Sequence, residues 1–222
     1  MIVDLNLKGK HAIVIGGGTE GVRKVNALLG QDCKVTVISN RFNKYLRDQE
    51  KAGKIETVKA TLKDASILDS YDSPFLVLAS TDDRELNRKL CQKAREKGAF
   101  VYSVDDPQYS DFSYASVVNI EGVMQVAIST SGKSPIMARQ VRIRAERVLK
   151  RIIKKADIEN AKLQEFARNA AKPKLKTVEQ RKEFLYSLLH DSRVQNLIKE
   201  DRIEDAKSTT LELLQEWVKK SK

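Results

Sequence analysis

The stretch HAIVIGGGTEGVRKVNALLG, residues 11–30, decides the fold. It begins with a short apolar, β-branched run, which is typical of a buried parallel strand. It ends with apolar residues spaced along one face of a helix, which Gly30 can close. The glycines between these parts form the pattern G-x-G-x-x-G as Gly16, Gly18 and Gly21. We therefore predict a strand, a tight turn and a helix.

Each glycine of this pattern has its own predicted role. Gly16 permits the tight turn, Gly18 lets the backbone approach a pyrophosphate, and Gly21 lets the helix pack closely on the sheet. The start of the helix, at Thr19 and Glu20, offers free N–H groups and the positive end of the helix dipole to phosphates. The pattern in this setting predicts a dinucleotide site, and the alternative is a glycine turn that binds nothing.

The alternation of strand and helix continues through the first hundred residues. We predict strands over 11–16, 34–39, 54–60, 74–80 and 99–104, with helices over 21–31, 41–52 and 81–98. Thr81 or Asp82 can cap the third helix, and Gly98 can end it. Strands that alternate with helices in this way predict an α/β fold with a doubly wound, Rossmann-type parallel sheet.

The pattern changes after residue 113. Residues 114–130 are two β-rich runs joined at Glu121-Gly122, which predicts a hairpin. From Pro135 the sequence is helical almost to its end, with breaks predicted at Pro173 and over 190–195. The predicted organisation is a Rossmann domain over 1–113, a β-rich segment over 114–145 and a helical C-terminal domain over 146–222.

Composition limits the class of protein. The net charge is +11, and residues 139–222 contribute most of it, with 22 Lys/Arg against 13 Asp/Glu. Such a segment suits an anionic partner, namely nucleic acid, a membrane surface or a polyanionic small molecule, or it is only a solvated face. No apolar run is long enough to span a bilayer, and the early glycine pattern leaves no room for a signal peptide. Neither the two cysteines nor the two histidines have metal-ligand spacing, so we expect a cytoplasmic protein without a resident metal.

Two nucleotide-related details remain open or are rejected. The second strand ends at Ser39-Asn40-Arg41, without the acidic residue that usually binds the ribose of NAD. Arg41 would suit the 2′-phosphate of NADP, whereas in the alternative Asn40 binds the ribose and Arg41 faces solvent. The SGKS sequence at 131–134 is not a P-loop, because Ala127 occupies the position where a P-loop requires glycine.

Four motifs occur in order along the chain: GGGTEGVRK, ASTDDRELN (79–87), VDDP (104–107) and VAISTSGKSPIMAR (126–139). Together they resemble the N-terminal half of siroheme synthases and stand-alone precorrin-2 dehydrogenases. The first two occur in many Rossmann proteins, whereas the last is far more specific. The resemblance implies NAD-dependent oxidation of precorrin-2 to sirohydrochlorin, and in some members insertion of ferrous iron to give siroheme. It also implies a homodimer in which the β-rich segment forms the dimer contact.

The same resemblance assigns roles to particular residues. Asp105, at the end of the fifth strand, is the candidate acid/base, and the ends of Rossmann strands do open onto the nicotinamide. The alternative is that Asp105-Asp106-Pro107 is only a turn. Thr81 joins the cofactor residues. The expected contacts to the polycarboxylate substrate are Ser129, Thr130, Ser131, Ser134, Arg139 and Arg142. Iron, where it is used, would be a substrate rather than a resident metal.

Two other functions compete with this one. A nucleotide-sensing Rossmann module with a basic, partner-binding tail would not need Asp105 or the SGKSP sequence. The tail also lacks aromatic interleaving, so we predict no nucleic-acid or membrane partner. A reductase of another small molecule would use the same crevice with different loops. The sequence leaves open chelation, NAD against NADP, the physiological metal, and which protomer completes each active site.

Overall fold

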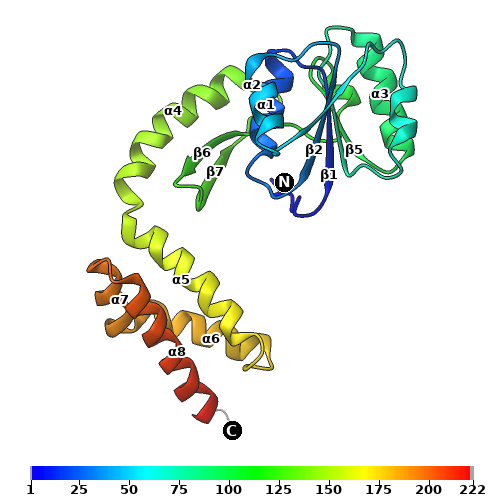
Figure 1. Cartoon of the computed structure of the whole chain (residues 1–222). Coiled ribbons are helices and arrows are strands. Elements are labelled where there is room, and N and C mark those ends of the chain that lie inside the picture. The colour runs from blue at the N-terminus through cyan, green and yellow to red at the C-terminus, as the bar shows by residue number, and fades with distance from the viewer. Residues whose placement is uncertain (1, 221–222) are drawn as a thin grey trace. The chain divides into compact units, whose positions relative to one another are not determined.

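The computed structural model describes residues 2–220. The chain divides after Tyr114 into two compact units (Figure 1). Each unit has its own buried apolar core.

The first unit is built on a five-stranded parallel sheet. The strands are β1 (His11–Ile15), β2 (Lys34–Ser39), β3 (Glu56–Lys59), β4 (Leu76–Ala79) and β5 (Phe100–Ser103). Their order is β3-β2-β1-β4-β5, and Val14 of β1 lies opposite Val37 of β2 and Leu78 of β4. All five predicted strands are confirmed. The strand order reverses between β1 and β4, which is where such sheets bind ligands.

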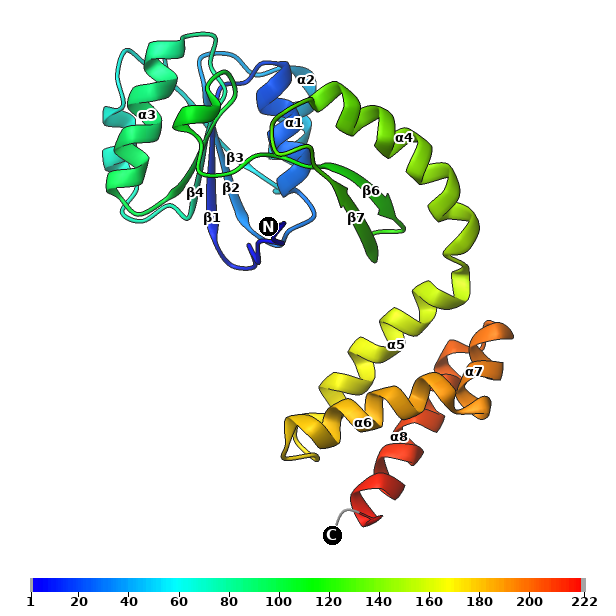
Figure 2. The same cartoon turned by 180° about the vertical axis from the view of Figure 1, so that it is seen from behind.

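Helices cover both faces of this sheet (Figures 1 and 2). On one face lie α1 (Thr19–Leu28) and α2 (Lys44–Lys51), whose Val25 and Leu46 pack with Val14. On the other face lie the 3₁₀ turn η1 (Ser66–Ser70) and α3 (Arg84–Glu96), whose Leu90 packs against Ile13. The strand residues therefore alternate between two cores, and the predicted doubly wound Rossmann architecture is confirmed.

The start of α3 differs from the prediction. The N-cap is Asp83, whose carboxylate accepts a hydrogen bond from the Leu86 N–H at 3.0 Å, so neither Thr81 nor Asp82 is the cap. Three consecutive residues in TDD have capping side chains, and the sequence pattern alone does not select among them. At the other end Gly98 follows the helix with a φ of +78°, as predicted.

The second unit begins with the predicted hairpin. Strands β6 (Ser116–Ile120) and β7 (Met124–Ile128) are antiparallel, and Ile120 pairs with Met124. Glu121 and Gly122 have φ values of +52° and +72°, which a tight reversal requires. Val118 and Ile120 pack with Ile158 in a small core of their own.

Five helices complete this unit: α4 (Pro135–Ile152), α5 (Lys155–Ala171), α6 (Val178–His190), α7 (Ser192–Lys199) and α8 (Ile203–Lys220). Both predicted breaks are confirmed, and two further breaks were not predicted. The chain is extended at Ile153 and Lys154, where the Asp157 carboxylate accepts the Lys154 N–H. It turns again at Asp201, with a φ of +62°. Phe184 and Leu163 lie in the core of this helical part.

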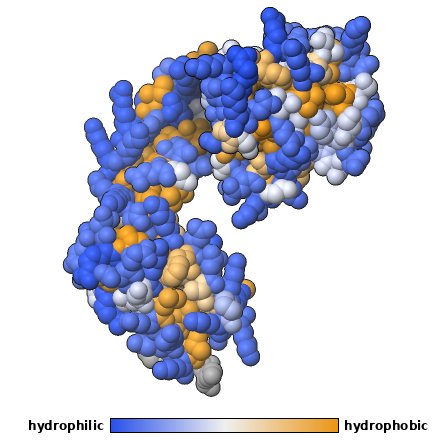
Figure 3. Space-filling view, viewed as in Figure 1, coloured by the Kyte–Doolittle hydropathy of each residue, from blue (hydrophilic) through white to orange (hydrophobic). Residues whose placement is uncertain are grey.

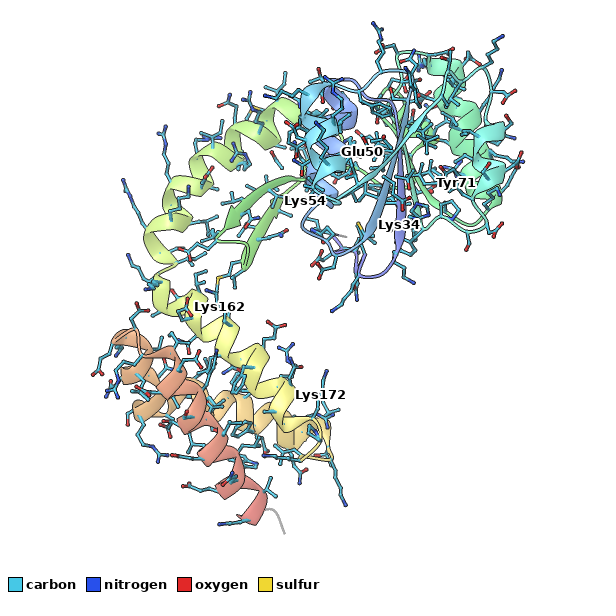
Figure 4. All side chains as sticks on the ribbon, viewed as in Figure 1. Lys34, Glu50, Lys54, Tyr71, Lys162 and Lys172 are labelled. Carbon is cyan, nitrogen blue, oxygen red and sulfur yellow. The ribbon has the colours of Figure 1, made fainter. Side chains whose placement is uncertain are left out.

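Charged side chains lie along the outside of α5, with Lys162 in mid-helix and Lys172 just after its end (Figure 4). Figure 3 shows hydrophobic side chains among hydrophilic ones at the surface of α4, where Ile136, Val148 and Ile152 are exposed. No helix within residues 2–220 is both long and apolar enough to cross a membrane.

Candidate functional site

The first unit contains a pocket of about 420 Å³ at the carboxyl ends of β1, β2 and β4. Among the predicted cofactor residues, those that line it are Gly16, Gly18, Asn40, Arg41 and Thr81. Thr19, Glu20 and Gly21 belong to the first turn of α1 and are not lining residues. A separate cluster of polar residues, which includes Lys34 and Tyr71, lies at the other end of the strands, where β2 and β4 begin (Figure 4).

The glycines that shape this pocket differ in the space around them. Gly16 has a φ of +116°, and a Cβ there would lie 2.3 Å from the Ser80 carbonyl oxygen. A Cβ on Gly21 would lie 1.9 Å from the Gly16 carbonyl oxygen, so α1 packs on the turn only because residue 21 is glycine. A Cβ on Gly18 would meet nothing within 4 Å. Gly18 is therefore not required by packing, and the space beside it is free for a ligand.

Gly17 is a constrained position that the motif treats as variable. A Cβ there would lie 2.4 Å from the Arg41 carbonyl oxygen, so the glycine turn and the end of β2 are in close backbone contact. The signal was present in the sequence, since three glycines run from 16 to 18. The G-x-G-x-x-G pattern alone does not distinguish the middle glycine from a free position.

The start of α1 fits a phosphate group. Its N-cap, Gly18, has no side chain to bond the free N–H groups of the first turn. Glu20 is turned to Arg23 in an exposed ion pair at 2.5 Å. Open space beside Gly18 and an uncapped helix N-terminus together form the cradle that a pyrophosphate needs.

Ser80 is a pocket residue that the sequence analysis missed. Its Oγ is the one buried side-chain polar atom without a hydrogen-bond partner among residues 2–220, and the residue lines the pocket. A buried hydroxyl without a partner is costly, so a ligand with a polar group is a natural partner for it. The signal was the polar residue that ends the apolar run PFLVLAS.

At the ribose end of the pocket, β2 is followed by Asn40 and Arg41, both exposed. The Arg41 N–H donates to Ser39 Oγ at 3.4 Å, and no acidic side chain from this strand end lines the pocket. The lining acids, Asp82 and Asp83, come from the loop after β4. This end therefore offers an amide and a guanidinium to a ribose or its phosphate.

Asp105 and Asp106 follow β5 and have different surroundings. Asp105 is exposed, and its Oδ1 accepts hydrogen bonds from Ser103 Oγ at 2.7 Å and Asn87 Nδ2 at 3.2 Å. Asp106 is buried and accepts from Arg88 Nη2 at 2.9 Å and Arg84 Nη2 at 3.2 Å. The guanidinium of Arg88, then the Gln108 N–H and the guanidinium of Arg84, hold the pKa of Asp106 below its ordinary value.

These contacts divide the two roles that the sequence analysis considered. Asp106 also caps the 3₁₀ turn η2 (Pro107–Tyr109) by accepting the Gln108 N–H at 3.2 Å, so the turn role falls on Asp106. Asp105 caps no backbone group within residues 2–220 and keeps an exposed carboxylate at the end of β5. It is therefore the carboxylate that is accessible to a reactant.

Lys24 is a second charged residue in an unusual place. It lies on the buried face of α1, and its Nζ is 4.0 Å from the ring centroid of Tyr102 and 3.8 Å from that of Tyr114. Burial lowers the pKa of Lys24 to about 8. Its spacing from Gly21 and Leu28, three and four residues away, places all three on one helix face and could have revealed its burial.

In the second unit, most of the predicted substrate hydroxyls take part in the turn before α4. Ser129 Oγ accepts the Ser131 N–H at 3.1 Å, and Thr130 Oγ1 accepts the Ser134 N–H at 3.0 Å. Ser134 is the N-cap of α4 and accepts the Met137 N–H at 3.2 Å. Ser131 has a φ of +50° and is exposed. The turn is held together by its own hydroxyls.

The two predicted arginines of α4 differ in their pairing. Arg142 donates to Glu146 at 2.7 Å in a partly buried ion pair. Arg139 is exposed and forms no ion pair with any residue from 2 to 220. Within the same range, no group of three or more His, Cys, Asp or Glu side chains is arranged to hold a metal ion.

Comparison with known proteins agrees with this geometry. Residues 3–116 match a family described as putative NAD(P)-binding, and residues 121–144 match one described as sirohaem biosynthesis protein central. The chain is 36% identical over 145 residues to a siroheme synthase of Nitrosococcus oceani, which covers 65% of the chain and 30% of that protein. It is 32% identical over 203 residues to a siroheme synthase of Mannheimia succiniciproducens, covering 91% and 40% respectively. The chain thus spans well under half the length of these relatives.

A solved structure, SirC, precorrin-2 dehydrogenase, has the same fold. It superposes with a TM-score of 0.65 at 19% sequence identity, over 92% of this chain and 99% of the other. The pocket, the glycine turn and the matched regions agree on a nicotinamide dinucleotide as the class of cofactor. The chain belongs to the siroheme synthase family, as a putative NAD(P)-binding domain followed by the central segment of sirohaem biosynthesis proteins.

Proposed function

We propose that this chain oxidises precorrin-2 to sirohydrochlorin with NAD. Its relatives carry the name siroheme synthase, and the similar structure is titled a precorrin-2 dehydrogenase. One observation carries the proposal. The dinucleotide pocket and the exposed carboxylate of Asp105 follow the neighbouring strands β4 and β5 at the same edge of one sheet. A hydride acceptor and a proton acceptor are the two groups that a dehydrogenation needs.

In this proposal, residues of the first unit bind the cofactor and accept the proton. The N–H groups at the start of α1 bind the pyrophosphate, and the space beside Gly18 admits it. Ser80 Oγ and the Thr81 backbone line the pocket and orient the cofactor. Bound NAD would supply the site that accepts the hydride. Asp105 takes the proton that the macrocycle loses, through Oδ2, which accepts no hydrogen bond within residues 2–220.

For the cofactor we propose NAD, with Asn40 bonded to the ribose and Arg41 turned to solvent. The support is that both side chains are exposed and line the pocket, so Asn40 can reach a ribose while Arg41 stays in solvent. Arg41 would also suit a 2′-phosphate. The two cofactors are therefore compared directly in the test below.

The substrate carries many carboxylates, and we propose that the second unit binds some of them. Arg139 is the first candidate, since it is exposed and unpaired within residues 2–220. Ser131 is the second, because its hydroxyl is exposed, whereas Ser129, Thr130 and Ser134 already bond the turn. Arg142 would have to leave Glu146 to take part.

We also propose that the protein is a homodimer in the cytoplasm. The exposed apolar residues of α4, Ile136, Val148 and Ile152, are more easily explained by a partner surface than by solvent. Cys33 and Cys91 are both free thiols, which suits a reducing compartment. Light scattering at micromolar concentration measures the mass, and a monomer of 25.1 kDa would contradict the dimer.

The test is an oxidation assay. The purified chain is mixed with precorrin-2 and either NAD or NADP, and the reduced cofactor and the tetrapyrrole spectrum are followed together. We expect sirohydrochlorin with NAD and loss of the reaction in Asp105→Ala. A folded protein that binds NADH but leaves the spectrum unchanged would favour the nucleotide-sensing module instead. Addition of ferrous ion to the product then tests chelation, in which Asp105 would accept the pyrrole protons.

A further inference from the structure

Asn87 occupies an unusual place for an amide. It lies in the first turn of α3 with 0% exposure, beside Leu86 and Leu90 of the apolar core. A buried amide is costly unless its donors and acceptors are bonded. All four of its hydrogen-bonding positions are used, and they are shared between only two residues, Thr81 and Asp105.

On one side Asn87 clamps Thr81. Its Oδ1 accepts from the Thr81 N–H at 3.1 Å and from Thr81 Oγ1 at 2.7 Å, and its Nδ2 donates to the Thr81 carbonyl oxygen at 3.0 Å. Thr81 lines the dinucleotide pocket, directly after β4. The three bonds fix both the backbone and the hydroxyl of this pocket residue.

On the other side Asn87 reaches Asp105. Its second Nδ2 hydrogen is donated to Asp105 Oδ1 at 3.2 Å, and Ser103 Oγ donates to the same oxygen at 2.7 Å. Ser103 is itself only 2% exposed. Both donors are buried and bond one oxygen, so the carboxylate cannot rotate without breaking both bonds. Oδ2 accepts no hydrogen bond from any residue between 2 and 220.

We infer that Asn87 and Ser103 are positioning residues that hold Asp105 by Oδ1 and so present Oδ2 as the proton acceptor. Through Asn87 the same clamp ties this carboxylate to the cofactor wall at Thr81. The inference rests on the proposed role of Asp105 as the base. It goes beyond that role because it assigns the reacting oxygen and names the two residues that orient it. Fixed orientation matters because small displacements of a reacting group cost large factors in rate.

The plainer explanation is that Asn87 only secures the loop before α3. Its three bonds to Thr81 would serve that purpose alone. Ser103, however, makes no side-chain bond to that loop, and its hydroxyl donates to Asp105. Ser103→Ala therefore separates positioning from loop structure, because it leaves no buried polar group unbonded and changes only the support of the carboxylate.

The experiment measures kcat for precorrin-2 oxidation and KM for NAD in five proteins. They are the unchanged chain, Ser103→Ala, Asp105→Asn, the double variant of these two, and Thr36→Val as the control. Thr36 is equally buried, at 1%, but lies in β2 and bonds His11 and Glu56. We expect Ser103→Ala to lower kcat about tenfold at unchanged KM for NAD, on the scale of one lost hydrogen bond to a charged group. The control is expected to keep its kcat.

The double variant decides between the explanations. If Ser103 acts through Asp105, Ser103→Ala lowers kcat no further in the Asp105→Asn background. A further tenfold loss there, or a normal kcat in the single variant while Asp105→Asn is inactive, would overturn the inference. A fully active Asp105→Asn would instead remove the proposed base, and the positioning role with it.

A second readout does not depend on turnover. In an amide NMR spectrum the side-chain NH₂ of Asn87 is expected to be protected from solvent exchange, since both hydrogens are donated. Asp105→Ala removes one acceptor, so one of the two hydrogens should shift and exchange faster. An Asn87 NH₂ pair that is unchanged in Asp105→Ala would show that the clamp does not reach this carboxylate.

Discussion

Replacement of Gly18 by alanine should weaken cofactor binding while leaving the fold intact. Gly18 has a φ of −74° and a ψ of −170°, which alanine also adopts, and its added Cβ meets nothing within 4 Å. Alanine stabilises such a position by roughly 0.4–1 kcal/mol through the unfolded chain. Its poorer capping of the helix start costs a similar amount, about 0.5–1 kcal/mol. The free energy of unfolding should therefore change by less than about 0.5 kcal/mol.

The cost in cofactor affinity comes from the same open space. A methyl group beside the uncapped start of α1 would stand where the pyrophosphate approaches. Forcing a methyl into a filled contact costs about 1–3 kcal/mol. That corresponds to a Kd for NADH about 5 to 150 times weaker.

Gly21→Ala is the matched control, because it makes the same chemical change three residues along the same turn. Its Cβ would lie 1.9 Å from the Gly16 carbonyl oxygen, and neither a Cβ nor a backbone carbonyl can turn aside, so α1 must move away from β1. We expect a loss of about 3 kcal/mol. In a chain of this length that lowers Tm by roughly 6–12 °C.

The assay measures Tm by circular dichroism and the Kd for NADH by its fluorescence in both variants. Gly18→Ala should keep Tm within about 2 °C of the unchanged chain and lose affinity. If it binds NADH normally, the space beside Gly18 is not the pyrophosphate site. If it lowers Tm as much as Gly21→Ala does, the separation between a binding glycine and a packing glycine is wrong.

Three further predictions concern charged residues. Arg88 and Arg84 hold the pKa of Asp106 below its ordinary value, so the stability it contributes is present above about pH 4 and lost as the pH falls through the lowered pKa. Asp106→Asn should therefore have a lower Tm than the unchanged chain at pH 7, and the difference in Tm should narrow below pH 4. A difference in Tm that stays constant with pH would contradict this. Burial lowers the pKa of Lys24 to about 8 from 10.5, so the unfolded chain binds more protons between these values. The free energy of unfolding measured in urea should rise with pH across that window, and it should rise less in Lys24→Met. Equal slopes of this free energy against pH in the two proteins would refute the prediction. Arg41→Ala should weaken NADP binding about tenfold or more, on the scale of one charged hydrogen bond, and leave NAD binding unchanged. Equal losses for both cofactors would mean that Arg41 does not discriminate between them.

The parts of the fold that were predictable are those set by local sequence. Apolar runs mark the five strands, and Glu121-Gly122 marks the hairpin, because period and turn chemistry act over a few residues. The cap of α3 was not predictable, since Thr81, Asp82 and Asp83 all have capping side chains. The break at Ile153 was also missed, because a helical pattern runs through it and the Asp157 carboxylate that bonds Lys154 marks it only once the chain is folded.

The site was predictable where a motif fixes the backbone and unpredictable where side chains meet across elements. Gly16 and Gly21 leave no room for a Cβ, as their spacing predicts, and the space beside Gly18 is open. The approach of a pyrophosphate to Gly18 stays a prediction. Asn87 and Ser80 were missed for the opposite reason. Asn87 comes from α3, but its partners follow β4 and β5, and only the sheet order brings them together. The Ser80 hydroxyl was likewise recognised only in the structure, where it is buried without a hydrogen-bond partner.

The two aspartates after β5 show how the surroundings assign chemistry to identical side chains. Asp106 is bonded by two guanidiniums of α3 and by the Gln108 N–H, so its carboxylate ties the start of η2 to α3. Asp105 is exposed and is held by neutral donors on one oxygen only, and its other oxygen accepts no hydrogen bond within residues 2–220. A carboxylate that is paired with arginines is a poor base, because its charge is already compensated and its proton affinity is reduced. A carboxylate that is oriented but not paired with a cation keeps a fixed direction. The same turn thus provides a structural anchor in Asp106 and, one residue earlier, the exposed carboxylate that we propose as the proton acceptor.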